Sequence, residues 1–144
     1  MQIGIIGLGR MGANIARRLM QNGHQVVGYD ANAAAVKGLE GAAPASSVAD
    51  LIKQLKAPRA VWVMLPAGHI TEQTIHQLGT LLDKADVVID GGNTYFKDDI
   101  RRAHALHHKG IAYLDVGTSG GVWGLERGYC MMIGGDKGHV NRLD

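Results

Sequence analysis

The sequence predicts an α/β fold, a doubly wound parallel sheet with helices on both faces. Short apolar segments rich in β-branched residues alternate along the chain with longer segments whose apolar residues recur at helical spacing. Strands that alternate with helices pair in parallel through right-handed crossovers, which buries both faces of the sheet. No linker, repeat or low-complexity segment interrupts the pattern, so residues 1–144 are predicted to form a single domain.

The predicted strands are short apolar segments bounded by turn residues, and they span 2–6, 25–29, 60–65, 86–90 and 111–116. Trp62 and Tyr113 fall inside them and are expected in the core. The loop 38–47 has room for a two-residue edge strand. A further apolar strand, YCMMIG, covers 129–134, and Cys130 within it is expected to be a buried, unreactive thiol.

The predicted helices carry apolar residues three and four positions apart, and they span 11–23, 46–55, 69–82 and 95–110, with a short helix at 31–36. Ser46 is expected to cap the helix at 46–55, because its hydroxyl can accept a backbone N–H. Gly23 and Gly110 are placed just past helix C-termini, where left-handed backbone is favoured. The segment DKGHVNRLD, 136–144, begins one more helix.

The composition argues against several classes of partner. A net charge of +2 with scattered basic residues does not indicate nucleic-acid or membrane binding. No apolar segment is long enough to span a bilayer, and the N-terminus lacks the basic leader and cleavage site of a signal peptide. A single cysteine excludes a disulfide framework, so a cytoplasmic, reducing environment is expected.

A glycine-rich turn follows the first predicted strand and opens the first predicted helix. Gly7, Gly9 and Gly12 form a G-x-G-x-x-G pattern, in which the glycines allow a tight turn, backbone approach to a pyrophosphate and close helix–strand packing. Asp30 ends the next strand, 18 residues after Gly12, where a carboxylate can reach the adenosine ribose hydroxyls. Together these features predict a Rossmann-type dinucleotide site. The alternative is a plain tight turn with Asp30 as a solvated strand end.

Asp30 also bears on the choice of dinucleotide. A carboxylate accepts hydrogen bonds from a 2′-hydroxyl and repels a 2′-phosphate, which calls for a nearby arginine or lysine. After Asp30, no basic side chain occurs before Lys37. The sequence therefore favours NAD as cofactor over NADP.

Five motifs follow one another in a set order: GLGRMGANIARRL (7–19), GHQVVGYDAN (23–32), VMLPAG (63–68), DGGNTYFKDDIRR (90–102) and DVGTSGGVWGLERGYCMMIGG (115–135). With these motifs nearly the whole chain resembles 6-phosphogluconate dehydrogenases, most of all the shorter, NAD-linked bacterial branch. It also resembles, more broadly, the β-hydroxyacid dehydrogenases, which include 3-hydroxyisobutyrate dehydrogenase. That second type usually carries a serine–threonine pair where this chain has Gly92 and Asn93.

The resemblance implies two sets of site residues. The cofactor set comprises Gly7, Leu8, Gly9, Arg10, Met11, Gly12, Asp30, Leu65, Pro66, Ala67 and Asn93. The substrate set comprises Asn93, Ser119, Gly120 and Gly121. A serine hydroxyl and bare backbone N–H groups suit a substrate carboxylate, although the second glycine loop could also be a simple turn between strands. Val122 and Trp123 stand where NADP-linked relatives carry two acids, so no contact of those acids is carried over.

The resemblance also implies a reaction. The family oxidises the 3-hydroxyl of 6-phosphogluconate by hydride transfer to the nicotinamide, and loss of CO2 then leads to ribulose 5-phosphate in the pentose phosphate pathway, where gluconate is used. The family's catalytic lysine and glutamate lie in an all-helical second domain, beyond the position of Asp144. We therefore expect this chain to be the cofactor domain of a longer, homo-oligomeric enzyme, without catalytic residues of its own and inactive alone.

Other interpretations stay open at this stage. The full-length protein could oxidise another 3-hydroxy acid, of the 3-hydroxyisobutyrate type, or the chain could be a module that senses NAD without chemistry. His104, His107 and His108 have the helical spacing of metal ligands, but no nearby acid or cysteine completes a site, so a solvated helix face and no metal are expected. Arg101 and Arg102 are expected to form surface ion pairs.

Overall fold

A single seven-stranded sheet organises the protein, in the order β3-β2-β1-β4-β5-β6-β7. The computed structural model describes residues 1–66, 68–92, 96–119 and 124–143, except for the side chains at 96, 97 and 99. The strands are β1 (Gln2–Ile6), β2 (Gln25–Tyr29), β3 (Ala43–Pro44), β4 (Ala60–Val63), β5 (Val87–Asp90), β6 (Ala112–Ser119) and β7 (Cys130–Gly134). The helices are α1 (Arg10–Gln21), α2 (Ala33–Lys37), α3 (Val48–Gln54), α4 (His69–Leu81), α5 (Phe96–His107), α6 (Gly124–Arg127) and α7 (Lys137–Arg142).

The pairing of the strands confirms the predicted doubly wound, Rossmann-type α/β sheet. Strands β1 to β6 all pair in parallel, and only β7 runs antiparallel, against β6. The chain moves outward from β1 to β3 and then returns to place β4 on the other side of β1. This reversal opens a crevice at the carboxyl ends of β1 and β4, which is where open α/β sheets bind ligands.

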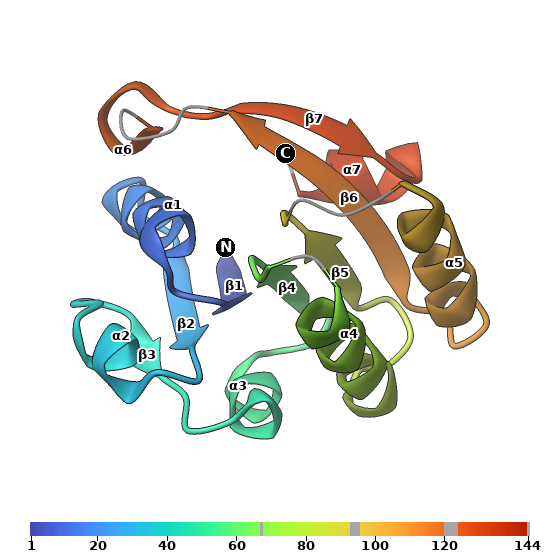
Figure 1. Cartoon of the computed structure of the whole chain (residues 1–144), viewed down its shortest axis with the longest axis horizontal. Helices are drawn as coiled ribbons and strands as arrows, with labels where there is room; N and C mark the ends of the chain where they lie inside the picture. The colour runs from blue at the N-terminus through green and yellow to red at the C-terminus, as the bar shows by residue number, and fades with distance from the viewer. Residues whose placement is uncertain (67, 93–95, 120–123, 144) are drawn as a thin grey trace.

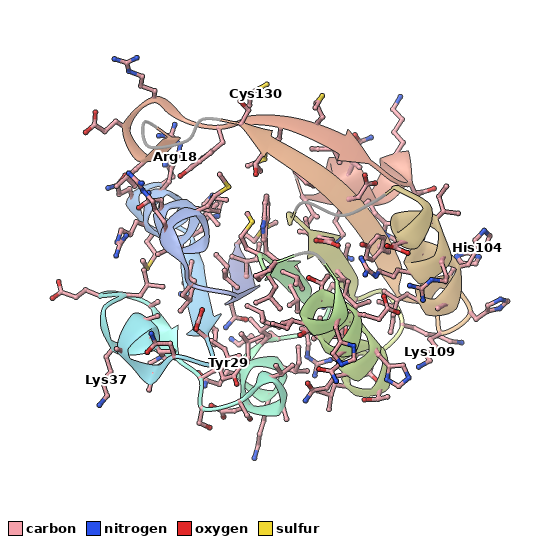
Figure 2. All side chains as sticks on the ribbon, viewed as in Figure 1. Arg18, Tyr29, Lys37, His104, Lys109 and Cys130 are labelled. Carbon is pink, nitrogen blue, oxygen red and sulfur yellow. The ribbon has the colours of Figure 1, made fainter. Side chains whose placement is uncertain are left out.

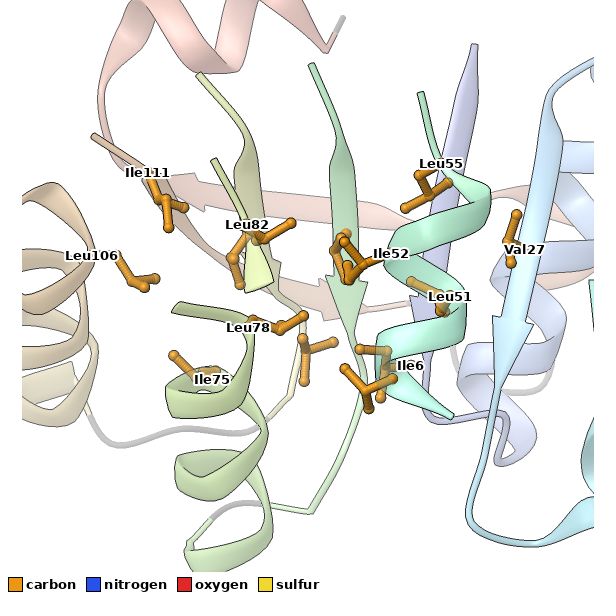
Figure 3. Close-up of a cluster of buried hydrophobic side chains, with 14 of the residues drawn as sticks. Ile6, Val27, Leu51, Ile52, Leu55, Ile75, Leu78, Leu82, Leu106 and Ile111 are labelled. Atoms are coloured by element: carbon orange, nitrogen blue, oxygen red, sulfur yellow. The ribbon is translucent and has the colours of Figure 1, made fainter. Parts of the chain in front are cut away.

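Each face of the sheet has its own apolar core. On one face α3, α4 and α5 contribute Leu51, Leu78 and Leu106, which pack on residues of the sheet such as Val61 (Figure 3). The other face packs chiefly against α1, with Ile15 and Ala16, and is joined at its border by Val140 of α7. Trp62 and Tyr113 are both buried in these cores, as the sequence predicts.

Strand β6 is longer than the sequence predicts. Its apolar pattern ends at Val116, yet the strand continues to Ser119, because its last residues pair with β7 in the register Ser119↔Cys130. Figure 1 shows the β6–β7 pair extending beyond the rest of the sheet to α6, which lies beside α1. The Arg18 guanidinium of α1 donates to the Leu125 carbonyl at 3.1 Å and fixes that contact.

The ends of the helices agree with the sequence prediction at Gly23 and Gly110, but the predicted cap of α3 is wrong by one residue. The cap of α3 is Ser47 and not Ser46: the Ser47 hydroxyl accepts the Asp50 N–H at 3.0 Å, while the Asp50 carboxylate accepts the Ser46 N–H at 2.9 Å. This reciprocal pair resembles a capping box shifted by one residue. Gly23 and Gly110 follow α1 and α5 with φ of +85° and +76°, as predicted for residues beyond a C-terminus.

Strand β7 departs most from the sequence prediction. Met131, Met132 and Ile133 are 39%, 76% and 48% exposed, and the prediction of a buried Cys130 is wrong because that thiol is exposed (Figure 2). Within the described residues no strand pairs with the outer side of β7. An apolar strand becomes buried only where another layer of the protein covers it, so its sequence alone does not establish burial. No helix in the described part of the chain is long and apolar enough to cross a membrane.

Candidate functional site

A cleft of about 330 Å³ lies at the carboxyl ends of the central parallel strands, at the crevice where the strand order reverses. It is lined by Gly9, Arg10, Met11, Gly12, Met64, Leu65, Pro66, Gly91, Gly92, Gly117 and Thr118. These residues come from the turn into α1, the segments after β4 and β5, and the carboxyl-terminal part of β6. Sequence-distant segments therefore meet at one opening.

The glycine turn is shaped by contacts that exclude side chains. Gly7 has a φ of +98°, and a Cβ there would meet the Met64 carbonyl. A Cβ on Gly12 would overlap the Gly7 carbonyl oxygen, so α1 can approach β1 only with glycine at this position. At Gly9, by contrast, an added Cβ would have no described atom within 4 Å other than those of its chain neighbours. The backbone of Gly9 thus borders open space.

The start of α1 gives this open space a chemical preference. The first intrahelical bond runs from the Ala13 N–H to the Gly9 carbonyl, at 2.9 Å. The N–H groups before Ala13 have no intrahelical acceptor, and the helix dipole adds positive potential at this end. A helix of 12 residues that begins at a cleft beside an unobstructed glycine suits an anionic group such as a phosphate.

Asp30 is fastened to the glycine turn. Its carboxylate accepts the Leu8 N–H at 2.7 Å and the Asn32 N–H at 2.8 Å, so the end of β2 and the turn are held together. Leu8 itself is buried under the turn. A carboxylate offers about four lone-pair positions, so the half-buried Asp30 keeps acceptor capacity toward solvent.

The remaining predicted residues fall in three groups. Arg10, Met11, Leu65 and Pro66 line the cleft beside Gly9 and Gly12. Ser119 lies at the end of β6, exposed, one residue beyond the cleft-lining Thr118. Ala67, Asn93, Gly120 and Gly121 lie outside the described residues.

Two hydrogen bonds brace the cleft from its sides. The Thr118 hydroxyl donates to the Met11 sulfur at 3.3 Å, which joins β6 to the first turn of α1. The Thr71 hydroxyl donates to the Pro66 carbonyl at 2.6 Å, which fastens the segment after β4 to α4. Each bond thus ties a segment that lines the cleft to a neighbouring helix.

Sequence reasoning missed part of the lining: Met64, Gly91, Gly92, Gly117 and Thr118. A signal was available for Gly91 and Gly92, because the pair follows a strand end in the motif DGGN. A Cβ on Gly92 would come within 2.6 Å of the Leu65 carbonyl, and one on Gly91 would strike the Trp62 indole. These glycines therefore let the segments after β4 and β5 touch.

A buried polar network lies behind this wall, and it corrects the prediction for Arg102. The Arg102 side chain is 3% exposed, not on the surface: its Nε donates to Glu72 Oε2 at 2.8 Å and its Nη1 lies 3.5 Å from Asp90 Oδ2. The Tyr113 hydroxyl donates to Asp90 Oδ2 at 2.8 Å. Arg101 does pair on the surface, with both Glu72 oxygens at 2.8 and 2.9 Å.

Charge in this network makes stability depend on pH. Hydrogen bonding from Arg101 is the main cause that lowers the pKa of Glu72 from 4.5 to about 2, ahead of the opposing cost of burial and the bond from Arg102. Since the carboxylate is favoured in the folded state, its stabilisation is complete above pH 4.5 and is lost as the pH falls toward about 2.

We expect Glu72→Gln to lower the free energy of unfolding at pH 7 by about 1 kcal/mol, a value reduced for solvent screening because the side chain is 37% exposed. Urea unfolding at pH 7, 5 and 3 measures the difference in free energy of unfolding between the variant and the parent. This difference, or gap, should become smaller at pH 3. Glu40→Gln, at an exposed glutamate outside the described ion pairs, is the control and should show no gap. A gap that stays constant with pH would contradict the ion-pair explanation.

Three histidines lie near the end of α5: His104 and His107 within it and His108 directly after it. His104, His107 and His108 are exposed, and Figure 2 shows His104 directed away from the protein. Among the residues that the structure describes, no group of His, Cys, Asp or Glu side chains could hold a metal ion.

Comparisons of this chain with a family model and with individual known proteins point to the same family. The model of the NAD-binding domain of 6-phosphogluconate dehydrogenase matches residues 2–144. The NAD(+)-dependent, decarboxylating 6-phosphogluconate dehydrogenase of Haloferax volcanii is 47% identical over 145 residues, which cover 99% of this chain and 48% of that protein. The Bacillus subtilis protein of the same name is 39% identical over 141 residues, or 94% and 30%. The chain thus spans half or less of the length of these relatives.

Solved structures show the same fold. The 6-phosphogluconate dehydrogenase of Plasmodium falciparum superposes with a TM-score of 0.90 at 29% identity, over 99% of this chain and 32% of that one. The 3-hydroxyisobutyrate dehydrogenase of Mycobacterium tuberculosis superposes with a TM-score of 0.88 at 27% identity, over 99% and 49%.

Proposed function

The chain belongs to the 6-phosphogluconate dehydrogenase family as its NAD-binding domain, and on this premise we propose that it holds NAD in the cleft for the oxidative decarboxylation of 6-phosphogluconate. The observation that carries the proposal is the open backbone of Gly9 at the start of α1, beside an Asp30 that is hydrogen-bonded into the same turn. The first suits a pyrophosphate and the second a ribose diol.

The proposed placement of NAD runs from Asp30, beside the glycine turn, into the cleft. Asp30 accepts from the adenosine ribose, while the N–H groups at Gly9 and the start of α1 bind the pyrophosphate. The nicotinamide end then falls among Met11, Leu65 and Thr118, which line the rest of the cleft. Bound NAD would supply the hydride acceptor. Arg10, Leu8 and Pro66 shape the turn and the loop around it, and Ala67 and Asn93 belong to the same proposed set.

We place the substrate next to the nicotinamide end, at the end of β6. Ser119, exposed beyond Thr118, can donate its hydroxyl to the substrate carboxylate, and the proposed set includes Asn93, Gly120 and Gly121. Oxidation at the 3-hydroxyl gives a β-keto acid, which loses CO2 readily because the electrons move into the carbonyl. What these residues contribute is orientation of the carboxylate and hydroxyl before that step.

A second candidate substrate is another 3-hydroxy acid, favoured by the likeness to the 3-hydroxyisobutyrate dehydrogenase of M. tuberculosis. Gly92 argues against this substrate, because 3-hydroxyisobutyrate dehydrogenases usually carry a residue with a hydroxyl side chain at this position. In this chain a Cβ at Gly92 would press on the Leu65 carbonyl. Assays of the full-length protein with both acids decide between them. A sensor without chemistry would show NAD binding and no turnover even at full length.

NAD binding itself is the first test. Calorimetry of the 144-residue chain with NAD and NADP should show tighter binding of NAD, and absence of NAD binding would overturn the proposal. Combining Asp30→Asn with Ala31→Arg should shift the preference toward NADP by about 1–3 kcal/mol, since the carboxylate no longer repels the 2′-phosphate and the arginine can donate to it. Asparagine keeps one acceptor oxygen, for the Leu8 N–H, and gives up the bond from the Asn32 N–H. Ala31→Arg alone is the control and should shift the preference less.

A further inference from the structure

We propose that Arg102 is a positioning residue for the NAD cleft, which fixes from behind the two loops that form one wall of it. The inference rests on the proposed function, because the cleft concerned is the one proposed to hold NAD. Arg102 lies in α5, its side chain is 3% exposed, and it is absent from the cleft lining. Its effect on a ligand would therefore pass through its two acidic partners.

The first partner, Asp90, controls the turn after β5. The Arg102 Nη1 lies 3.5 Å from Asp90 Oδ2, and the Tyr113 hydroxyl donates to the same oxygen at 2.8 Å. The other oxygen, Oδ1, accepts the Gly92 N–H at 3.0 Å. Because Gly91 and Gly92 both line the cleft, the orientation of the Asp90 carboxylate sets the position of that lining.

The second partner, Glu72, lies in the first turn of α4. The Arg102 Nε donates to Glu72 Oε2 at 2.8 Å, and the neighbouring Thr71 hydroxyl holds the Pro66 carbonyl at 2.6 Å. Leu65 and Pro66 line the cleft on the side where the Leu65 carbonyl backs onto Gly92. One guanidinium thus forms ion pairs with two carboxylates, Glu72 and Asp90, that support two loops in contact at the cleft.

Burial of this ion pair is not explained by stability alone. Removing an arginine and a carboxylate from water costs free energy that their attraction often only offsets, so apolar replacements of such pairs can be neutral. Loss of one partner does destabilise, since the other charge is left buried. A test must therefore separate a loss of folding from a loss of cleft geometry.

The chain offers a matched control at the opposite end of the same strands. Arg59 directly precedes β4 and Asp86 directly precedes β5, at the amino ends of the two strands. The Arg59 Nη1 lies 3.1 Å from Asp86 Oδ2, and the Asp86 side chain is fully buried while that of Arg59 is 18% exposed. Arg59–Asp86 is therefore a comparable buried pair without contact to the cleft lining.

The experiment compares Arg102→Met with Arg59→Met in the 144-residue chain. Thermal melting gives the stability of each variant, and NAD titration by calorimetry well below each melting temperature gives the affinity of the folded protein. Both variants should melt earlier than the parent. Only Arg102→Met should bind NAD more weakly, by about tenfold, the scale expected when supporting residues let a site shift. Arg102→Lys, which keeps the charge but not the two-sided fork, should restore part of the affinity.

Each outcome decides the inference. Equal NAD affinity in Arg102→Met, Arg59→Met and the parent would overturn it, as would an equal loss in both variants. Failure of the parent to bind NAD would overturn the proposed function, and the inference with it. If Arg102→Met does not fold, Tyr113→Phe takes its place, because it keeps the ring and removes one donor to Asp90. Unchanged affinity in Tyr113→Phe would then count against the inference, and about threefold weaker binding would support it.

Discussion

The 144-residue chain, mixed with NAD and 6-phosphogluconate, is expected to bind the cofactor and to produce no reduced nicotinamide. Hydride loss from a hydroxyl carbon needs a base for the hydroxyl proton, and its absence costs about 10²–10⁴-fold in rate. Among the described residues that line the cleft there is no lysine, histidine, aspartate or glutamate. Ser119, at the end of β6, can orient a substrate but is a weak base at neutral pH.

Absorbance of the reduced nicotinamide measures this directly, with NAD binding to the same sample as the control for a competent cleft. The resemblance to the family implies that the base is a lysine of a second, helical domain, so a protein that carries both domains is the positive control for turnover. Clear turnover by the 144-residue chain, lost in Asn93→Ala, would mean that it carries a base outside the described lining.

Gly9→Ala is expected to weaken NAD binding by roughly two orders of magnitude, about 2.7 kcal/mol, while the protein stays folded. The Gly9 backbone has φ −64° and ψ −173°, which alanine adopts without strain, and its Cβ would meet no described protein atom within 4 Å. That methyl group would instead occupy the space where a pyrophosphate must approach the helix start. Loss of glycine at an N-cap should cost no more than about 1 kcal/mol of folding free energy.

Gly12→Ala is the matched comparison, since its Cβ would overlap the Gly7 carbonyl oxygen. It should destabilise the fold by about 3 kcal/mol, because the helix must move away from the strand. Urea unfolding and NAD titration of both variants separate the role of Gly9 in phosphate binding from the role of Gly12 in packing the helix against the strand. Parent-like NAD affinity in a folded Gly9→Ala protein would refute the phosphate-binding role of the turn.

The local elements of this protein could be predicted from its sequence because their causes are local. The strands β1 and β2 begin and end where the apolar segments 2–6 and 25–29 do. The glycine turn was predictable because only glycine tolerates the φ of +98° at Gly7 and the close approach at Gly12. The spacing from Gly12 to Asp30 predicted that Asp30 lies beside the glycine turn. That spacing is also set locally, because it corresponds to one helix and one strand of ordinary length.

Tertiary structure alone decided the features that depend on distant neighbours. Strand β6 continues to Ser119 because β7 supplies its hydrogen-bond partners. Cys130 is exposed because an apolar strand is buried only when another layer covers it, and the sequence of β7 does not record whether one does. Arg102 is buried because Glu72 and Asp90 come from two other elements to compensate its charge. The periodicity of a helix indicates which of its faces is apolar. The fold as a whole decides which charged partners come close enough to make burial of a charge possible.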